Sequence, residues 1–334
     1  MADKLGAAVI GLGMMGERHA AVWAELPTTR IVSVYDVVEE KTQSLATQLG
    51  CHAAESIEDV LSQPGVDLVS VCTDDQRHLE PCLAAAAAGK HILLEKPLAT
   101  TLEDCDRIIE ACATAGLKLM VGHIVRFDPR YALAKQAIDE GKVGEIVQVY
   151  GRRNNIIDSG RRIGPRTSVA YFLGVHDLDL MRWFVGSEVL KVHAESACKV
   201  LADIAAEDSI MALLRYENGA IGCLETCWVM PRGVPCTLDA RLEVIGTEGM
   251  VRATVGDEGC SIINDHRTTR PDILYGPLLH GEQQGALRTQ LAHFADCVLN
   301  DRAPLISPAD ARAAVEIACA IHESLRSGAP VYLA

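Results

Sequence analysis

Two short motifs contain the residue types that redox chemistry on a nucleotide cofactor requires. One is a G-x-G-x-x-G pattern over residues 11–16, and the other is the triplet Glu95-Lys96-Pro97. Glycines at this spacing let the backbone turn tightly and approach the pyrophosphate of a dinucleotide. A lysine beside a bound nicotinamide can polarise a substrate hydroxyl and stabilise the alkoxide that forms as hydride leaves. The two motifs together predict hydride transfer to a nicotinamide cofactor, with Lys96 as the catalytic cation.

The residues around the glycine pattern support a cofactor role. An apolar strand candidate at 7–10 precedes it and a helical pattern follows from Glu17, which is the context that a dinucleotide site needs. The N-terminus of that helix would present unpaired N–H groups to the phosphates. The predicted cofactor contacts in this segment are Gly11, Gly13, Met14, Met15 and Gly16.

An acidic residue after the second strand candidate bears on which cofactor binds. Residues 31–35 form that strand, and Asp36 follows Gly16 by 20 positions (36 − 16 = 20). A carboxylate there can bind the ribose hydroxyls and would repel a 2′-phosphate, and no basic residue stands at 37 or 38 to bind one. NAD is therefore favoured over NADP. Asp36 could also cap the helix that follows.

Up to about residue 122 the chain alternates β-branched runs with helical patterns. Further strands are predicted at 68–72, 91–94 and 117–121, and helices at 41–49, 78–88 and 102–115. This alternation predicts an α/β domain over residues 1–122, built on the doubly wound parallel sheet of a Rossmann fold. Ligands of such sheets bind at the carboxyl ends of the strands, where Asp36, Thr73 and Lys96 fall.

Beyond Arg126 the pattern changes to a few helices and a run of strands. Helices are predicted at 129–140, 176–184, 287–300 and 308–327, and strands at 189–199, 209–216, 220–229 and 238–245. Asn218-Gly219 is typical of a hairpin turn between antiparallel strands. We therefore predict a C-terminal α+β domain, residues 123–334, with a large, mostly antiparallel open sheet. One face of such a sheet rests on helices, and the other is solvated or paired with another subunit.

Composition excludes several classes of partner. The chain has 334 residues and a formal net charge of −14, whereas nucleic acid or an anionic membrane would require a basic surface. No apolar leader precedes the first strand, and the longest apolar stretch, 82–88, is too short to span a bilayer, so a cytoplasmic protein is expected. The twelve cysteines form no C-x-x-C pair, and no histidine or acid cluster accompanies Cys223 and Cys227, so no metal site is predicted.

The Glu95-Lys96-Pro97 triplet after a glycine-rich nucleotide motif resembles one known family. This is the family of glucose-fructose oxidoreductase, the inositol dehydrogenases and the rhizopine-catabolism oxidoreductases (GFO/IDH/MocA). The resemblance runs over nearly the whole chain. Besides the two motifs it includes 66–69 with Thr73 and His78, Gly122-His123 with Arg126, Phe127 and Pro129, and the segments 144–146, 176–179 and 304–314.

The resemblance implies an N-terminal Rossmann domain, a C-terminal domain whose open sheet forms the substrate floor and subunit contact, and a homo-oligomer, either a dimer or a tetramer. It implies reversible oxidation of a sugar or cyclitol hydroxyl, with the residues matching Lys96 and His176 on either side of the reacting carbon. The additional cofactor contacts that it implies are Thr73, His78, Glu95, Lys96, Pro97 and Arg126. The implied substrate contacts are Lys96, His123, Arg153, Asn154, Asn155, Asp158 and His176.

One position departs from the family pattern. Most members resembling inositol dehydrogenase carry an aspartate four residues before the histidine, whereas this chain has Phe172. His176 could still accept the hydroxyl proton if a neighbouring acid held its tautomer. Asp177 is the predicted partner, and Asp179 is the other acid on the segment.

The segment 156–168 is predicted to be a loop long enough to act as a lid. It contains Arg161, Arg162 and Arg166. These cations indicate either an anionic substrate or ion pairs on a solvated surface, and the sequence leaves both open.

These inferences combine into a predicted activity. The chain is expected to be an NAD-dependent oxidoreductase acting on CH–OH groups, which oxidises a ring hydroxyl of a cyclitol such as inositol, or of a monosaccharide or sugar derivative. Lys96 and His176 would handle the proton. Two alternatives stay open: a 3-dehydrogenase of a UDP-linked amino sugar, and a non-redox glycosidase of the same fold that uses NAD. The presence of Lys96 and His176 disfavours a sensor without turnover.

Overall fold

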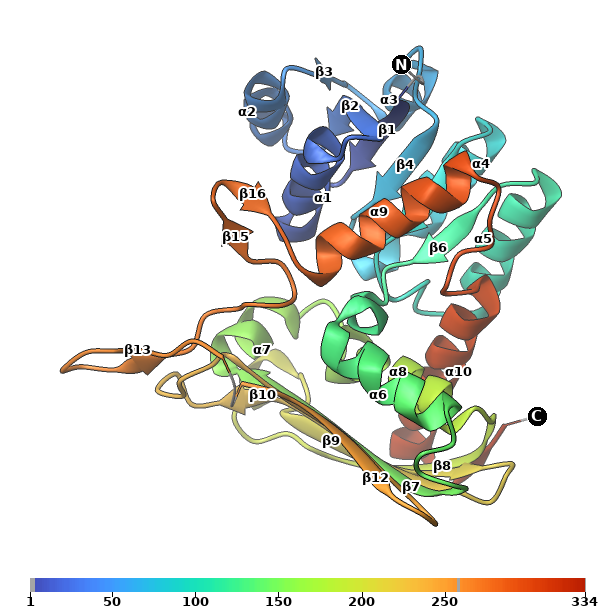
Figure 1. Cartoon of the computed structure of the whole chain (residues 1–334), viewed down its shortest axis with the longest axis vertical. Helices are drawn as coiled ribbons and strands as arrows, with labels where there is room; N and C mark the ends of the chain where they lie inside the picture. The colour runs from blue at the N-terminus through green and yellow to red at the C-terminus, as the bar shows by residue number, and fades with distance from the viewer. Residues whose placement is uncertain (1–3, 257–258, 334) are drawn as a thin grey trace. The chain divides into compact units, whose positions relative to one another are not determined.

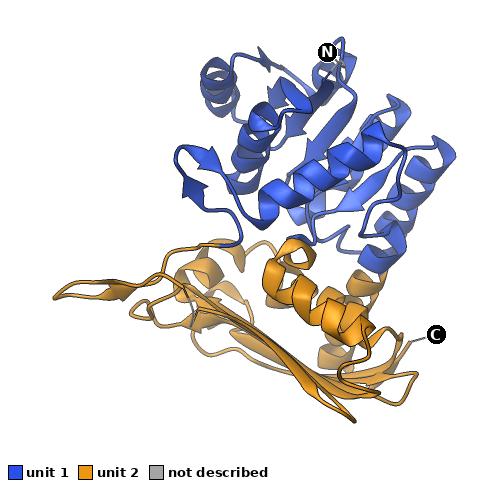
Figure 2. Cartoon of the chain, in the orientation of Figure 1, with its two compact units in different colours: residues 1–124, 274–312 blue, residues 125–273, 313–334 orange. Residues whose placement is uncertain are grey.

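The computed structural model describes residues 4–256 and 259–333 (Figure 1). The chain forms two compact units (Figure 2). Unit 1 comprises Met1–Ile124 and Leu274–Arg312, and unit 2 comprises Val125–Ile273 and Ala313–Ala334. The predicted boundary at residue 122 lies close to the first passage between units. The predicted second domain, 123–334, is however divided between them, because 274–312 packs with the N-terminal part of the chain.

Within the described residues, unit 1 is built on a six-stranded parallel sheet. Its strands are β1 (Leu5–Ile10), β2 (Thr29–Tyr35), β3 (His52–Ala53), β4 (Leu68–Val71), β5 (His91–Leu94) and β6 (Leu119–Val121). The order β3-β2-β1-β4-β5-β6 confirms the predicted doubly wound sheet. The strand order reverses between β1 and β4, and the crevice at the carboxyl ends of these strands is where such folds bind a dinucleotide.

Helices flank this sheet, and one of them comes from far along the chain. The helical segments of unit 1 are α1 (Met14–Glu25), α2 (Glu39–Leu49), α3 (Ile57–Ser62), η1 (Asp75–Arg77), α4 (Leu79–Ala87), α5 (Leu102–Thr114) and α9 (Ala286–Leu299). The Thr101 side chain accepts a hydrogen bond from the Asp104 N–H and so fixes the start of α5, as the sequence predicts. A short hairpin, β15 (Leu278–Leu279) and β16 (Glu282–Gln283), precedes α9, which packs beside α1 (Figure 1).

In the part of the chain that the structure describes, unit 2 is built on a seven-stranded sheet ordered β12-β11-β7-β10-β9-β8-β17. The strands are β7 (Ile146–Ile156), β8 (Val189–Ala197), β9 (Ser209–Tyr216), β10 (Ile221–Met230), β11 (Leu238–Gly246), β12 (Met250–Val255) and β17 (Val331–Tyr332). Strands β7 and β10 are parallel and the other neighbours are antiparallel, which confirms the predicted sheet type. The hairpin between β9 and β10 turns at Asn218 and Gly219, where Gly219 has a φ of 90°.

Helices cover one face of this sheet and leave the other open. Along β9, Ile210, Ala212 and Leu214 are buried, whereas Met211 and Leu213 are 57% and 60% exposed. The helical segments are η2 (Ile124–Phe127), where the chain enters this unit, α6 (Pro129–Asp139), α7 (Ile157–Ile163), the π-helix η3 (Ala170–Gly174), α8 (Val175–Val185), η4 (Ala202–Ile204) and α10 (Pro308–Ser327), which begins in unit 1 and enters unit 2 at Ala313. Figure 1 shows α6 and α8 on the same side of the sheet, and α8 packs on β7.

Two features of unit 2 differ from the sequence expectations or add to them. The predicted loop 156–168 is wrong in its first half, because α7 occupies Ile157–Ile163. A small hairpin, β13 (Ile262–Ile263) and β14 (Thr268–Thr269), follows β12. Across the ranges described for both units, no helix has the length and apolar character needed to cross a membrane.

Candidate active site

The glycine turn of unit 1 is shaped to admit a ligand to the backbone. Gly11 has a φ of 90°, and a Cβ added there would lie 2.7 Å from the Cys72 carbonyl oxygen. A Cβ on Gly16 would lie 1.8 Å from the Gly11 oxygen, so both glycines are required by the turn itself. A Cβ on Gly13 would meet nothing within 4 Å. The open space at Gly13, at the N-terminus of α1, fits the pyrophosphate of a dinucleotide.

Asp36 lies at the end of β2 and supports the same turn. Its Oδ2 accepts a hydrogen bond from the Leu12 N–H at 2.7 Å, and its Oδ1 accepts one from the Val38 N–H at 2.9 Å. The carboxylate therefore stabilises the glycine turn and the backbone that leads into α2. Because a carboxylate has about four lone-pair sites, it retains acceptor capacity for ribose hydroxyls.

His78, which the family resemblance places among the cofactor contacts, is directed into the protein. It is 1% exposed, with Nδ1 lying 2.8 Å from the Pro97 oxygen and Nε2 lying 3.2 Å from the Thr73 oxygen. Burial lowers the pKa of this imidazole, and the two carbonyls offset that effect only in part. His78 thus joins the loop after β4 to the loop after β5, and its ring nitrogens face backbone rather than cofactor.

Glu95 is likewise internal, because its side chain points away from the solvent and bonds a histidine of α1. Its Oε1 lies 3.1 Å from Nε2 of the fully buried His19. Burial alone would raise the pKa of Glu95, but the hydrogen bond from His19 and the nearby charge of Lys96 lower it. Lys96 follows at the end of β5, half-buried, and its peptide bond to Pro97 is cis. Lys96, Thr73, Asp36 and the glycine turn thus follow the carboxyl ends of unit 1 strands, as predicted.

The sequence analysis missed His19 as a residue of this region. It is a polar ring on the buried side of α1, four positions before the buried Trp23. That spacing places both rings on one face of the helix, which was the available signal.

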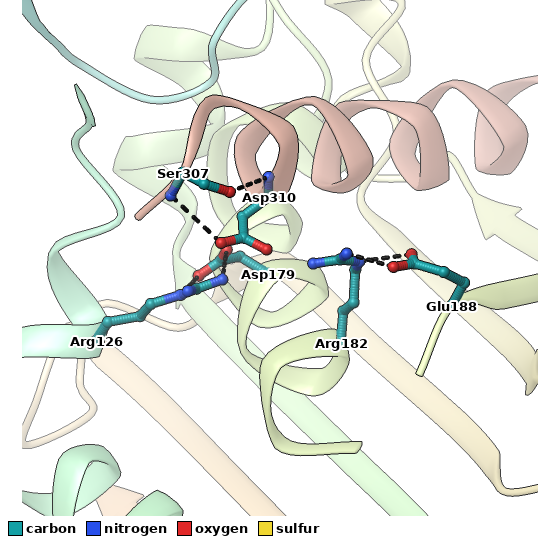
Figure 3. A network of polar contacts seen from close by, with 6 residues as sticks. All are labelled: Arg126, Asp179, Arg182, Glu188, Ser307 and Asp310. Atoms are coloured by element: carbon teal, nitrogen blue, oxygen red, sulfur yellow. Dashed lines mark hydrogen bonds and ion pairs between the residues drawn. The ribbon is translucent and has the colours of Figure 1, made fainter. Parts of the chain in front are cut away.

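Arg126, another predicted cofactor contact, is engaged inside unit 2. Its Nε donates to Asp179 Oδ2 at 2.8 Å and its Nη2 donates to Oδ1 at 2.6 Å (Figure 3). Arg126 is 3% exposed, and its guanidinium also lies 5.0 Å from the centre of the Trp183 ring. This bidentate pair gives Arg126 a charged partner within unit 2, and its predicted contact with the cofactor stays a prediction. Figure 3 also shows the Arg182–Glu188 pair and, in unit 1, the reciprocal Ser307–Asp310 cap that starts α10.

Asp177, the predicted partner of His176, belongs to a second buried ion pair. Arg153 Nε donates to Asp177 Oδ2 at 2.6 Å and Arg153 Nη2 donates to Oδ1 at 3.3 Å. Burial raises the pKa of Asp177, and the Arg153 charge opposes this. Both oxygens of Asp177 thus accept hydrogen bonds from Arg153 of β7, which gives Asp177 a partner other than the predicted His176.

His176 lies in the first turn of α8, directly after the π-helix η3, and is half-buried. Single π-helical turns inside helical segments are frequent at functional sites. Phe172, where most inositol-dehydrogenase-like members carry an aspartate, sits in that turn, with its ring 6.4 Å from the Trp228 ring. The family aspartate is thus replaced by an aromatic packing contact. Lys96 and His176 belong to different units.

The three residues predicted at the end of β7 do not share a face. Arg153 reaches the helix-covered side, whereas Asn154 Nδ2 donates to Glu225 Oε1 on the open side at 2.7 Å. Asn155 Oδ1 accepts hydrogen bonds from the Ile156 N–H and the Ser159 hydroxyl. Successive side chains of a strand alternate between faces, so these three residues lie in different surroundings, and their contact with substrate stays a prediction.

The last two predicted substrate residues lie in different settings. His123, after β6 in unit 1, is 1% exposed. Asp158 is on the surface of α7 and forms an ion pair with the exposed Arg232 at 2.7 Å. Arg161 of the same helix bonds Asp203. For Asp158 and Arg161, the alternative of surface ion pairs therefore agrees with the structure.

The strand order and the open glycine turn define unit 1 as the dinucleotide-binding domain of a two-domain oxidoreductase. Residues 5–123 match the family described as "Oxidoreductase family, NAD-binding Rossmann fold", and residues 131–252 match "GFO/IDH/MocA C-terminal domain". The chain belongs to the GFO/IDH/MocA oxidoreductase family. The resemblance inferred from the motifs is thereby confirmed, as is the assignment to NAD-dependent oxidoreductases.

Named relatives extend over the whole chain. The scyllo-inositol 2-dehydrogenase (NAD(+)) of Bacillus subtilis is 30% identical, over 100% of this chain and 97% of that protein. The myo-inositol 2-dehydrogenase of Thermotoga maritima is 28% identical, over 97% of each. Among solved structures, GenD2 from gentamicin A biosynthesis, in complex with NAD, gives a TM-score of 0.86 at 26% identity, over 100% of this chain and 97% of that one.

Proposed function

We propose that this protein is an NAD-dependent dehydrogenase that oxidises a ring hydroxyl of a cyclitol, with inositols as the first candidates. The observation that carries the proposal is the full-length similarity to a scyllo-inositol 2-dehydrogenase (NAD(+)) in a chain that has a lysine at the end of β5. A cyclitol presents several secondary hydroxyls, and a cation near one of them stabilises the alkoxide that develops as hydride leaves its ring carbon.

Different residues of unit 1 are proposed to bind different parts of the cofactor. Bound NAD would supply the hydride acceptor. The open backbone at Gly13 and the N–H groups of α1 would hold its pyrophosphate, and Asp36 would bind the ribose hydroxyls. Val37 and Val38 are exposed beside Asp36 and bring no cation, so we expect NAD to be preferred to NADP.

Lys96 and His176 are the proposed proton-handling pair. The ammonium of Lys96 would polarise the substrate hydroxyl, and the imidazole of His176 would accept its proton. Arg153 and Asp177 would act indirectly, because their ion pair fixes β7 to the first turn of α8, which carries His176.

We also propose that the protein assembles as a homo-oligomer through the open face of the unit 2 sheet. Met211, Leu213 and Ile221 are exposed on neighbouring strands of that face, at 57%, 60% and 48%. An apolar patch on a sheet face is typical of a protein interface. A second copy of this chain is the proposed partner.

A substrate panel tests the proposed reaction. Purified protein and NAD are offered scyllo-inositol, myo-inositol, neutral aldoses, uronic acids and UDP-linked amino sugars, and reduced-nicotinamide absorbance is followed. The proposal predicts net reduction with at least one inositol. NAD reduction with UDP-linked amino sugars alone would contradict the proposed substrate class and favour a sugar-nucleotide dehydrogenase. Release of a leaving group from a glycoside without net NAD reduction would contradict the proposed reaction and favour a glycosidase.

A further inference from the structure

Lys96 stands between two residues that are each anchored to a buried histidine. Glu95, before it, bonds His19 of α1 through its side chain. Pro97, after it, bonds His78 at the N-terminus of α4 through its carbonyl oxygen. Both histidines are essentially inaccessible, at 0% and 1% exposure. They therefore bond the two residues on either side of the lysine, one through a side chain and one through the main chain.

The hydrogen bonds around His19 determine where its proton lies. Trp23 Nε1–H donates to Ser70 Oγ at 2.8 Å, because an indole nitrogen can only donate. Ser70 Oγ lies 3.1 Å from His19 Nδ1, so its single proton is available for that nitrogen. A neutral imidazole then carries its own proton on Nε2 and donates it to the Glu95 carboxylate. These hydrogen bonds therefore all donate in one direction, from Trp23 through Ser70 and His19 to the ionised carboxylate of Glu95.

The surroundings of His78 favour the opposite tautomer. Both of its ring nitrogens face carbonyl oxygens, which only accept, and a neutral ring has one proton to give. The Pro97 oxygen is nearer to Nδ1, at 2.8 Å, than the Thr73 oxygen is to Nε2, at 3.2 Å. The proton therefore belongs on Nδ1, in the bond to Pro97.

We propose that His19 and His78 are positioning residues for Lys96, which hold the main chain on its two sides with opposite neutral tautomers. The proposal rests on the catalytic role of Lys96 in the proposed function. A displacement of about 1 Å in a reacting group can cost about a hundredfold in rate, so loss of either anchor should lower kcat. Neither histidine needs to touch substrate or cofactor for this effect.

Crossed amide substitutions test the proposal. An asparagine amide nitrogen lies near the position of histidine Nδ1, and a glutamine amide nitrogen lies near that of Nε2. His19→Gln and His78→Asn should therefore keep the donor that each anchor needs, whereas His19→Asn and His78→Gln lose it. We expect kcat to be about tenfold higher in the retaining variant at each position, while KM for NAD stays within about threefold.

The two positions are predicted to rank asparagine and glutamine in opposite orders, which a role in packing alone would not produce. The same ranking at both positions, or equal kcat within each pair, would overturn the proposal.

A second measurement needs no turnover and uses the unsubstituted protein. Nitrogen-15 NMR of histidine-labelled protein, assigned with the substituted variants, should give an Nε2–H tautomer for His19 and an Nδ1–H tautomer for His78. Identical tautomers, or a protonated ring at pH 7 to 8, would overturn the proposal even if the variants fold poorly. If the unsubstituted protein oxidises no cyclitol, the proposed function fails, and these NMR signals still decide whether the two anchors exist.

Discussion

At the scale of single residues, Asp36 stabilises the local backbone and is also a proposed ligand of the cofactor. It accepts hydrogen bonds from Leu12 and Val38, and it is the group proposed to bind ribose. Asp36→Asn keeps an acceptor for the turn but removes the charge that disfavours a 2′-phosphate. We expect the ratio of NADP to NAD affinity to rise at least about tenfold, by fluorescence titration.

Asp36→Ala provides the matched comparison. It removes the acceptor of both backbone N–H groups, so it should weaken NAD binding further. The lost hydrogen bonds to a charged group should lower the free energy of unfolding by about 1–3 kcal/mol, which a lower thermal midpoint would report. An unchanged cofactor preference in both variants would contradict the ribose assignment.

Some residue roles could be read from the sequence and others could not. The glycine pattern, Asp36 and Lys96 were placed correctly at strand ends because the strand order of a doubly wound sheet fixes where these ends meet. The partners of Arg126 and Asp177 were not predicted, because they lie 53 and 24 positions away in the chain. Sequence spacing carries no information about pairs that only tertiary packing brings together.

At the scale of elements, one buried aspartate organises the connection between β8 and β9. Asp208 accepts hydrogen bonds from the N–H groups of Lys199, Val200 and Leu201. Burial opposes its ionisation, but these three donors lower its pKa below the usual range. Asp208→Asn should therefore lower the free energy of unfolding at pH 7 by about 1–3 kcal/mol, measured by urea denaturation.

The pH dependence of that loss has a definite sign. A carboxyl whose pKa is lower in the folded than in the unfolded protein stabilises the fold at pH values above its unfolded pKa, near 3.9. This stabilisation disappears as the pH falls through the pKa of the folded state. The difference in free energy of unfolding between Asp208→Asn and the parent should thus be constant above about pH 5 and become smaller below about pH 4. Asp203→Asn, at an exposed pair with Arg161, serves as the control with little expected effect. A difference that widens on acidification would contradict the assignment.

Elements with a long, regular pattern were predicted well, and short ones were not. The ranges of β9 and α10 agree with the sequence pattern, since each has a clear apolar period and a turn or cap at its ends. Strand β3 has two residues and α3 has six, which is too short for either period to show. Helix α7 was taken for a loop because one glycine and two arginines interrupt its seven residues.

At the scale of the whole molecule, the chain crosses from one unit to the other more than once. Sequence order suggested a single cut at 122, but α9 returns to pack on α1 and so joins unit 1. Local sequence patterns cannot show such a return, because an apolar helix face does not specify which distant element it packs on. The Rossmann sheet was predictable from sequence, and the discontinuous division was not.

The proposed assembly belongs to the same scale. Leu213→Glu places a charge at the centre of the exposed apolar group on β9 and β10, and burying an unpaired carboxylate is costly. We expect the protein to shift to a smaller species in sedimentation velocity. Leu133→Glu, at a 65% exposed site on α6, should leave the assembly unchanged. A parent protein that is already monomeric, or an intact oligomer in Leu213→Glu, would contradict the interface.

The central claim is that Lys96 assists hydride transfer to NAD from a cyclitol ring carbon that bears a hydroxyl. Its most direct test is the rate of reduced-nicotinamide formation from scyllo-inositol and myo-inositol in the parent protein and in Lys96→Ala, with NAD affinity measured in parallel. The account predicts turnover in the parent, a loss of about a hundredfold or more in kcat in the variant, and NAD affinity within about threefold of the parent. Inositol turnover that survives the substitution, or an equal loss of NAD binding and rate, would contradict it.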